Sequence, residues 1–246
     1  MMKEMQELNF LTVYDINLNK IRVGSKNDGG YAIIDGLKYD LLISCGVSDD
    51  INFENEFVER YGVFCLAFDG TISTIPEHNR FVKVINKNIS DINTDSTTNL
   101  HGIFDTFDNI FLKMDIESYE YPWLDSLSHR QLNKISQLVI EFHFPTNEVD
   151  HLKMTKNFNT NQKLQIIQRL SNTHILTHLH PNNCCGFTLH NDIKIPNVFE
   201  CTFIRKDLCQ IKSQTSDPIP NDIYDSKNLD WLPDIELNCQ PYTNFQ

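Results

Sequence analysis

The stretch Phe111-Leu112-Lys113-Met114-Asp115-Ile116-Glu117-Ser118-Tyr119-Glu120 decides the fold, because an apolar run in it ends abruptly in acidic side chains. The stretch Leu138-Val139-Ile140-Glu141-Phe142-His143 follows a helix-length interval later and ends similarly. Since successive strand side chains alternate between faces, Glu141 and His143 point the same way, roughly 7 Å apart. We expect two neighbouring parallel strands whose carboxyl ends gather three carboxylates and an imidazole. Open α/β sheets bind their ligands at that edge.

The length and composition of the chain limit its class. Its 246 residues, 40% hydrophobic and 22% charged, suit one globular domain covering residues 1–246. No apolar run approaches the roughly 20 residues needed to cross a bilayer. Lys3, Glu4 and Glu7 stand where a signal peptide would be apolar. We therefore expect an intracellular, cytoplasmic protein without a membrane partner.

The net charge bears on the partners of the protein. A formal charge of −12 opposes binding to nucleic acid, because contacts with phosphate dominate that affinity. No cluster of Lys and Arg indicates a local basic groove. The charge therefore favours a small-molecule partner over nucleic acid.

The seven cysteines are odd in number and show no Cys-x-x-Cys spacing. Cys184 and Cys185 are adjacent, which is too close for an unstrained bridge between them. Reduced thiols in a reducing compartment fit this pattern best.

One part of the chain shows the order strand, glycine turn, helix, strand and acid. The apolar run 39–44 predicts a buried strand that leads into Gly46. The helix that follows ends at Gly62, and a second strand over 63–68 leads into Asp69. Asp69 comes 23 positions after Gly46, near the roughly 20-residue spacing of a ribose-binding carboxylate. This order is typical of a unit that cradles a nucleotide.

Strands and helices alternate along most of the chain. We predict strands over 21–36 (two segments around the turn 27–31), 81–85, 110–114, 137–144, 174–179 and 198–204, and helices over 100–107, 121–135 and 164–170. No helical pattern separates the last two strands, so we expect them to pair antiparallel. Residues 148–161 are polar and predict a long loop. Residues 213–246 predict an irregular surface wrap, anchored by Trp231, Leu232 and Ile235.

Seven strands alternating with helices are the element pattern of a Rossmann-like class I methyltransferase. That α/β fold has a mostly parallel seven-stranded sheet with an antiparallel last strand and helices on both faces. From about Arg22 to Arg205 the chain resembles the FkbM-like family of S-adenosylmethionine-dependent methyltransferases. The motifs that carry the resemblance are Arg22-Val23-Gly24, Asp28-Gly29-Gly30-Tyr31, Ser44-Cys45-Gly46-Val47, Phe68-Asp69-Gly70-Thr71, Leu112-Lys113-Met114-Asp115-Ile116-Glu117 with Glu120, Ile140-Glu141-Phe142-His143, His180-Pro181-Asn182-Asn183 and Pro196-Asn197-Val198-Phe199-Glu200.

The chain departs from the family pattern in two places. Relatives often carry a more glycine-rich first turn with an acid beside it, whereas Gly46 stands nearly alone beside Cys45. Many relatives also have Gly after Asp-x-Glu, where this chain has Ser118. Both changes bear on the geometry of the cofactor loop.

The resemblance implies S-adenosylmethionine as the methyl donor, and several residues are candidates for holding it. Gly46 lets the backbone approach the cofactor, and Asp69 is placed to accept both ribose hydroxyls. Segment 1–38, with its turn at Gly29, Gly30 and Tyr31, is expected to cover the amino-acid end of the cofactor. Glu54 is expected to meet its amino group, and Asp115 to contact it. Alternatively, residues 27–31 form only a hairpin turn, Asp69 has only a structural role at the end of a strand, and Glu54 lies on a solvated helix face.

A hydroxyl acceptor needs help to lose its proton, from a general base or from a metal ion. Asp115, Glu141 and His143 form a reasonable ligand set for Mg²⁺ or Mn²⁺. In this interpretation His143 or His180 assists deprotonation. In the metal-free alternative, Asp115 contacts the cofactor or substrate and His143 is the base. Glu120 is expected to favour the start of the next helix.

The acceptor is expected to meet Glu117, His180, Asn182 and Asn183, because paired amides suit a polyhydroxylated molecule such as a sugar. Turn formation alone also explains the two asparagines. The leading hypothesis is an O-methyltransferase acting on a sugar hydroxyl of a glycan or glycan precursor. One alternative is a metal-dependent hydrolase using Asp115, Glu141 and His143. The other is a non-catalytic nucleoside-binding module.

Overall fold

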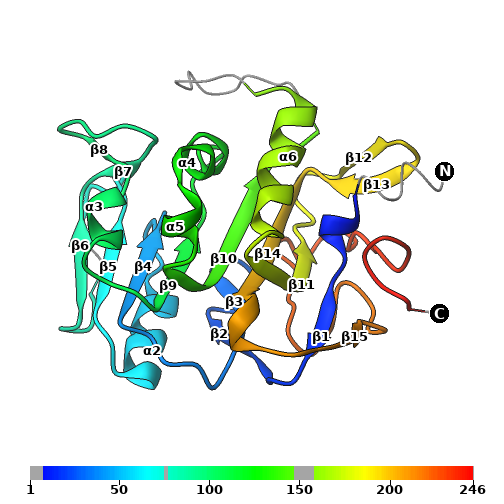
Figure 1. Ribbon diagram of the computed structural model, residues 1–246, viewed down its shortest axis with the longest axis horizontal. Coiled ribbons are helices and arrows are strands. Elements are labelled where there is room, and N and C mark those ends of the chain that lie inside the picture. Colours follow the sequence, from blue (N-terminus) through cyan, green and yellow to red (C-terminus); the bar gives the residue numbers. More distant parts are fainter. Residues whose placement is uncertain (1–7, 75–76, 147–157, 246) are drawn as a thin grey trace.

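A mixed sheet of seven strands forms the centre of the molecule (Figure 1). The computed structural model describes residues 8–74, 77–146 and 158–245. The strand order is β11-β14-β10-β9-β4-β5-β6. The strands are β4 (Leu41–Cys45), β5 (Cys65–Phe68), β6 (Val82–Ile85), β9 (Ile110–Met114), β10 (Ile135–His143), β11 (His174–Pro181) and β14 (Val198–Arg205). Only β14 runs antiparallel to its neighbours in this sheet, which confirms a mostly parallel sheet with an antiparallel last strand.

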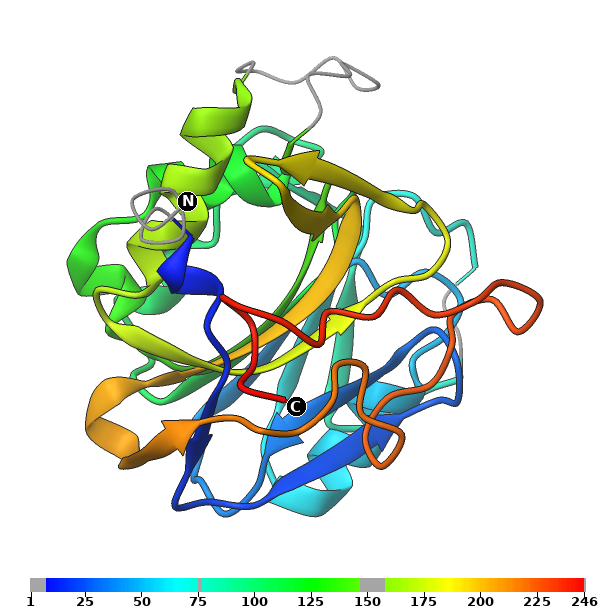
Figure 2. The ribbon, with the colours of Figure 1, turned by 90° about the vertical axis from the view of Figure 1, so that its right-hand side faces the viewer.

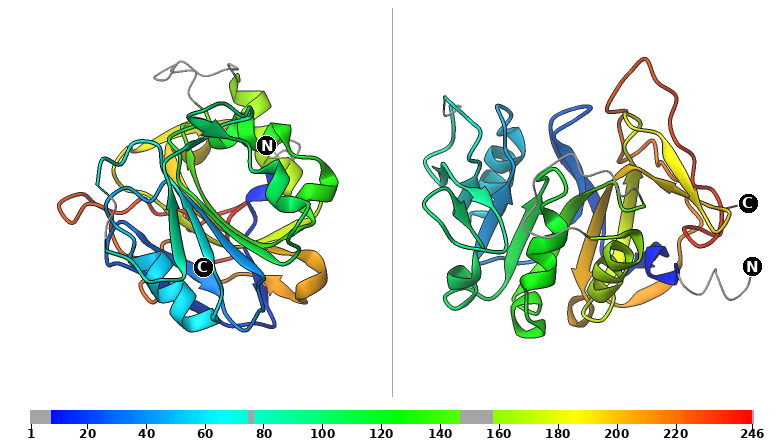
Figure 3. Two further views of the ribbon diagram at one scale, coloured as in Figure 1. Left: turned by 90° about the vertical axis from the view of Figure 1, so that its left-hand side faces the viewer. Right: turned by 90° about the horizontal axis from the view of Figure 1, so that it is seen from above.

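Alternation along the strands divides the core into two layers. Leu112 and Ile140 face a cluster that includes Trp123 and Ile167 from the helices α3 to α6. The helices of this layer are α3 (His101–Phe104), α4 (Glu120–Ser126), α5 (His129–Leu132) and α6 (Thr160–Leu170). Phe111 faces the other layer, where α2 (Asn52–Tyr61) packs. Helices therefore lie on both faces of the sheet (Figure 3).

A β-hairpin, not a helix, covers the part of the sheet face next to α2, and β1 (Tyr14–Ile16) packs beyond it against β11 and β14. The hairpin consists of β2 (Lys20–Gly24) and β3 (Gly30–Ile34), which pair antiparallel as predicted. The side chain of Gln137 accepts the N–H of Ile34 at 2.6 Å and donates to its carbonyl at 3.0 Å. Thr202 donates its hydroxyl to the carbonyl of Ala32. These bonds hold the hairpin against β10 and β14, so that its turn lies at the carboxyl edge of the sheet.

The predicted helix over 121–135 is wrong, because the structure breaks it into α4 and α5. Leu127 is extended, with ψ of 135°. Ser128 then caps α5, accepting the N–H of Gln131 while the Gln131 side chain accepts the N–H of Ser128. A capping box in the middle of an apolar pattern thus starts a new helix.

Smaller elements complete the chain. They are η1 (Asn9–Leu11), β1 (Tyr14–Ile16), β7 (Asn88–Ile89), β8 (Thr97–Thr98), β12 (Phe187–His190), β13 (Ile193–Pro196), η2 (Lys206–Leu208) and β15 (Ile211–Gln214). The hairpin β12–β13, which lies between β11 and β14 in the sequence, was not predicted. The predicted loop 148–161 lies mostly outside the described residues, and α6 already begins at Thr160.

The C-terminal wrap, described over residues 213–245, runs across the molecule as an irregular segment (Figure 2). Leu237 and Tyr242 are its fully buried anchors, and Ile235 is buried as predicted. Trp231 was predicted as an anchor, but its side chain is 77% exposed. The prediction for Trp231 is therefore wrong.

Cys184 and Cys185 form a disulfide between neighbouring residues, which corrects the expectation of reduced thiols for this pair. Both lie in the turn between β11 and β12, where their Cα atoms are 3.8 Å apart. Within the described ranges, no helix has the length and apolar character needed to cross a membrane.

Candidate functional site

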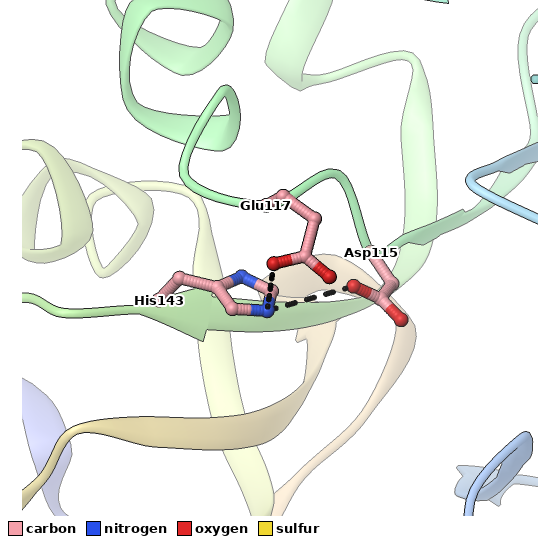
Figure 4. A group of neighbouring side chains, drawn as sticks. All are labelled: Asp115, Glu117 and His143. Carbon is pink, nitrogen blue, oxygen red and sulfur yellow. Dashed lines mark ion pairs between the residues drawn. The ribbon is translucent and has the colours of Figure 1, made fainter. Parts of the chain in front are cut away.

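Acidic side chains gather around the imidazole of His143 at the carboxyl edge of the sheet. Asp115 and Glu117 follow the end of β9, and Glu141 and His143 close β10. Figure 4 shows the carboxylates of Asp115 and Glu117 pointing at Nε2 of His143, at 3.7 and 3.6 Å. A carboxylate oxygen of Glu141 lies 3.6 Å from the same nitrogen. The structure therefore brings together the four residues that the two strand ends predict.

Glu120, the first residue of α4, is a fifth member of this group. Its side chain is 0% exposed, and its Oε1 accepts the backbone N–H of His143 at 2.8 Å. The same oxygen lies 3.2 Å from Nδ1 of His143. The sequence predicted only that Glu120 favours the start of its helix. It did not predict the contact of Glu120 with His143. We call Asp115, Glu117, Glu120, Glu141 and His143 the acid–histidine cluster.

Electrostatics keep His143 positively charged at neutral pH. Burial alone would lower its pKa, but the carboxylates of Glu120, Glu141 and Asp115 outweigh burial and raise the pKa to about 10. Burial and Asp115 raise the pKa of Glu141 well above its usual value. Burial also raises the pKa of Glu117, and Asp115 adds to this effect. One imidazolium thus faces four carboxyl groups, an arrangement that favours a further cation.

The cluster has the donor set of a metal site. Ligand atoms of Asp115, Glu117 and His143 all lie within 4.8 Å of one another. Carboxylate oxygens with one imidazole suit Mg²⁺ or Mn²⁺. Glu141 was the predicted third ligand, but one of its oxygens accepts the side-chain N–H of Asn182 at 2.9 Å. Glu117 therefore fits as third ligand better than Glu141, which stays beside the site.

A second acid–imidazole pair lies next to the cluster on the same face. The register of β14 sets Glu200 opposite Glu141 on one side and opposite His180 on the other. Nδ1 of His180 lies 3.4 Å from Oε2 of Glu200. Burial would lower the pKa of His180, but Glu200 and Asp225 raise it to about 9. In the sequence Glu200 was only one residue of a motif. Its pairing across β14 sets it between Glu141 and His180 at the site.

The turn of the β2–β3 hairpin lies near this cluster. Partial burial, with Asp115 and Glu200, raises the pKa of Asp28. Tyr31 is buried, and Nζ of Lys113 lies 5.4 Å from its ring centre. These interactions place the hairpin turn beside the cluster, and the covering of a cofactor by segment 1–38 stays a prediction.

Gly29 and Gly30 shape the hairpin turn. Gly29 has φ of 84°, and a Cβ on Gly30 would lie 2.0 Å from the carbonyl oxygen of Ser25. The described contacts therefore give both glycines a role in the turn, and their contact with a cofactor stays a prediction.

The loop after β4 has the tight geometry expected of Gly46. Its φ is 74°, and an added Cβ would lie 1.7 Å from the carbonyl oxygen of Asp115. Lys113 donates to the carbonyl of Gly46 at 2.7 Å and lies 3.9 Å from Oε1 of Glu54. The β4 turn is thus bound to the end of β9, beside the acid–histidine cluster.

Glu54 is fully buried, so its interpretation as a solvated residue is wrong. Its Oε1 accepts the hydroxyl of Ser44, and its Oε2 has no hydrogen-bond partner within the described residues. A buried carboxylate oxygen without a partner is costly and favours binding of a donor.

Asp69 braces the β4 turn with both of its oxygens. Oδ2 accepts the N–H groups of Val47 and Ser48 at 3.1 and 2.9 Å. Oδ1 accepts the N–H and the hydroxyl of Thr71 at 2.8 and 2.6 Å. Burial alone would raise the pKa of Asp69, but these bonds lower it. All four acceptor positions of the carboxylate are occupied.

The two asparagines after β11 differ in role. Asn182 donates to Glu141 and accepts the N–H of Cys184 at 2.9 Å, so it belongs to the edge of the cluster. Asn183 exchanges hydrogen bonds with the backbone of Leu229 and donates to the carbonyl of Leu232. Asn183 was predicted to bind substrate, but its amide holds the C-terminal wrap.

Comparison with known families gives one match. A family model described as the methyltransferase FkbM domain matches residues 14–176. A search of curated proteins gave no match. The matched range contains the hairpin, the β4 turn, Asp69 and the acid–histidine cluster, and it ends before His180, Asn182 and Glu200.

Proposed function

Because this chain belongs to the FkbM methyltransferase domain family, we propose that it transfers the methyl group of S-adenosylmethionine to a sugar hydroxyl of a glycan or glycan precursor. The observation that carries the proposal is the acid–histidine cluster at the carboxyl edge, directly beside the β4 turn. Parallel α/β sheets place their ligands in this crevice.

The residues at the β4 turn fit the cofactor. The unpartnered Oε2 of Glu54 suits the α-amino group, and Gly46 keeps the turn close to the strand end. When bound, the cofactor supplies a methyl group on a positively charged sulfonium. The excess of carboxylates nearby, with Asp115 closest to the turn, favours that charge.

Ribose recognition by Asp69 requires an exchange of hydrogen bonds. The bonds from Val47 and Ser48 hold the turn, whereas those from Thr71 lie within the adjacent Asp69–Thr71 turn. We infer that ribose hydroxyls replace the hydroxyl of Thr71 on Oδ1, because this exchange leaves the β4 turn in place.

The cluster prepares the acceptor hydroxyl. We propose that Asp115, Glu117 and His143 hold Mg²⁺ or Mn²⁺, and such an ion lowers the pKa of a bound hydroxyl. An imidazole accepts a proton only when it is neutral. The pKa values of His143 and His180 are raised to about 10 and 9, so both imidazoles carry a proton at neutral pH. Each can act as a base only after another cation has displaced that proton. We propose that Glu141, held beside the site by Asn182, accepts the proton when a bound cation keeps its carboxyl group ionised against the burial that raises its pKa.

The function is tested first by cofactor binding and then by transfer. We expect S-adenosylhomocysteine to raise the melting temperature, and labelled S-adenosylmethionine to methylate at least one neutral saccharide in a panel. Glu141→Gln should lower kcat without abolishing binding of S-adenosylhomocysteine, whereas the exposed control Glu77→Gln should change neither. Activity that survives exhaustive EDTA treatment rejects the metal.

The two alternative functions predict other results. A hydrolase would show no thermal shift with S-adenosylhomocysteine. A non-catalytic module would bind S-adenosylhomocysteine saturably and methylate no saccharide in the panel.

A further inference from the structure

The segment 221–232 of the C-terminal wrap crosses from the β2–β3 hairpin to the turn after β11. Arg22 donates to the carbonyl of Tyr224 at 2.9 Å, and Asn27 donates to the carboxylate of Asp230 at 2.9 Å. Asn183 binds the backbone of residues 229 and 232, on either side of Asp230. We call residues 221–232 the bridging segment.

Two anchors of the bridging segment are direct sequence neighbours of residues at the candidate site. Asn27 precedes Asp28, whose pKa is raised by burial and by Asp115 and Glu200. Asn183 follows Asn182, which donates to Glu141. Through Asn183 the bridging segment lies next to the Asn182–Glu141 edge of the acid–histidine cluster.

A further ion pair holds the middle of the bridging segment. A carboxylate oxygen of Asp225 lies 2.7 Å from Nε2 of His178, and both side chains are almost fully buried. His178 lies two residues before His180, on the same strand. The path of the segment is thus held at two places, around residues 224–225 and around residues 229–232.

Trp231 stands on this fixed backbone with its side chain in solvent. Asp230 and Leu232 on either side are both hydrogen-bonded, yet the indole is 77% exposed. The other tryptophan, Trp123, is 0% exposed in the core. Tryptophan is enriched at binding surfaces because its ring is apolar and its N–H is polar, so an exposed indole on an anchored backbone is a candidate recognition group.

The charge around Trp231 limits the kind of acceptor. Asp230 precedes Trp231, while Lys227 donates to the carbonyl of Leu232 at 3.2 Å and lies 3.8 Å from a carboxylate oxygen of Asp234, so charges of both signs border the indole. The formal charge of −12 repels an anionic acceptor, and carboxylates hydrogen-bond well to hydroxyl groups. Resting on the proposed function, we propose that Trp231 is the platform on which an uncharged sugar ring of the acceptor stacks. The family match ends at residue 176, so this platform belongs to the part of the chain outside it.

The two tryptophans allow a test of binding that does not depend on catalysis. Acrylamide should quench Trp231 strongly and Trp123 weakly. Cellobiose, lactose, maltose and chitobiose are the neutral probes, and glucuronate and glucose 6-phosphate are the anionic ones. We expect at least one neutral probe to protect wild-type Trp231 from acrylamide and neither anionic probe to do so. Trp231→Phe, which keeps only Trp123, should show no such protection.

Transfer kinetics supply the second test. Trp231→Ala should raise the KM for the protecting saccharide by about fivefold or more at similar kcat, since stacking on an aromatic ring is worth roughly 1 kcal/mol or more. Trp231→Phe should lie between Trp231→Ala and wild type. Ile223→Ala is the matched control on the same segment, because its side chain is 78% exposed, and it should leave KM unchanged.

The outcomes separate this proposal from the proposed function. Transfer to a neutral saccharide with an unchanged KM in Trp231→Ala overturns the platform and leaves the methyltransferase intact. Protection by the anionic probes also overturns it, as does failure of every neutral probe to protect Trp231. Absence of S-adenosylhomocysteine binding overturns the proposed function itself.

Discussion

The carboxylate of Glu120 holds the imidazole of His143 from behind: its Oε1 accepts the backbone N–H of His143 at 2.8 Å and lies 3.2 Å from Nδ1. Nδ1 is thereby directed to Glu120, and Nε2 is left to face Asp115, Glu117 and Glu141. A carboxylate behind a ligating imidazole orients the ring and raises its basicity. Glu120 is thus a positioning residue for the whole cluster.

Stability in EDTA should depend on pH through His143. The folded pKa is raised to about 10 from the ordinary 6.5, so the stabilisation is fully present below pH 6.5 and is lost as pH rises through about 10. Glu120→Gln removes one carboxylate and so lowers the folded pKa, so the pH-dependent loss of stability should be smaller and should be complete at a lower pH. Melting temperatures across this range and the NMR titration of His143 check both statements. An unchanged His143 titration in Glu120→Gln would contradict them.

Gly46→Ala should destabilise the protein by at least about 3 kcal/mol, because the positive φ and the contact with the Asp115 carbonyl both oppose a Cβ. Gly62→Ala is the matched control: φ is 67° there, but no atom lies within 4 Å of the added Cβ. It should cost only about 1 to 2 kcal/mol. Urea denaturation measures both changes, and equal losses would show that the close approach of Gly46 to Asp115 adds nothing.

Thr71→Val should leave binding of S-adenosylhomocysteine unchanged or stronger, because it removes the hydroxyl that occupies Oδ1 of Asp69. Asp69→Ala should weaken binding and also destabilise the fold by about 1 to 3 kcal/mol, since Val47 and Ser48 lose their acceptor. Calorimetric titration and urea denaturation separate the two effects. The exposed Asp49→Asn serves as control, and weaker binding by Thr71→Val would reject the exchange at Asp69.

Mn²⁺ binding should distinguish Glu117 from Glu141. Asp115→Asn, Glu117→Gln and His143→Gln should each weaken Mn²⁺ binding by about tenfold or more, because each removes one of three grouped ligands. Glu141→Gln should have a smaller effect, since Asn182 already occupies one of its oxygens. Electron paramagnetic resonance of free Mn²⁺ measures the affinities. If Glu141→Gln weakens Mn²⁺ binding more than the other changes do, the ligand set predicted from the sequence, with Glu141 in place of Glu117, is correct.

Short apolar runs and the glycine positions were enough to predict the sheet. The strands β4, β9 and β10 are such runs and are buried along their whole length, and Gly62 ends α2 in the left-handed conformation, with φ of 67°. Local signals of this kind act over a few residues and can be seen directly in the sequence. The capping box at Ser128 was also local, but the apolar pattern around it concealed it.

The candidate site was predicted only where its members follow strands in sequence. Asp115, Glu117, Glu141 and His143 could be placed together because parallel strands end at the same edge. Glu200 could not, since its partners depend on the register of β14 between β10 and β11. The burial of Glu120 and the bonding of Asp69 likewise depend on which loops pack together.

The sequence by itself thus determined the strand ends that carry the acids and the imidazole, because the hydrophobic pattern of each strand is a local property. Only the tertiary structure decided how these groups bond: Glu120 behind His143, Asp69 engaged by its own turn, and Asn183 bound to the C-terminal wrap. Hydrogen bonds between segments far apart in the chain depend on packing, and no pattern within one segment specifies them. The exposure of Trp231 has the same origin, since the anchors that hold its backbone lie at Asn27 and Asn183.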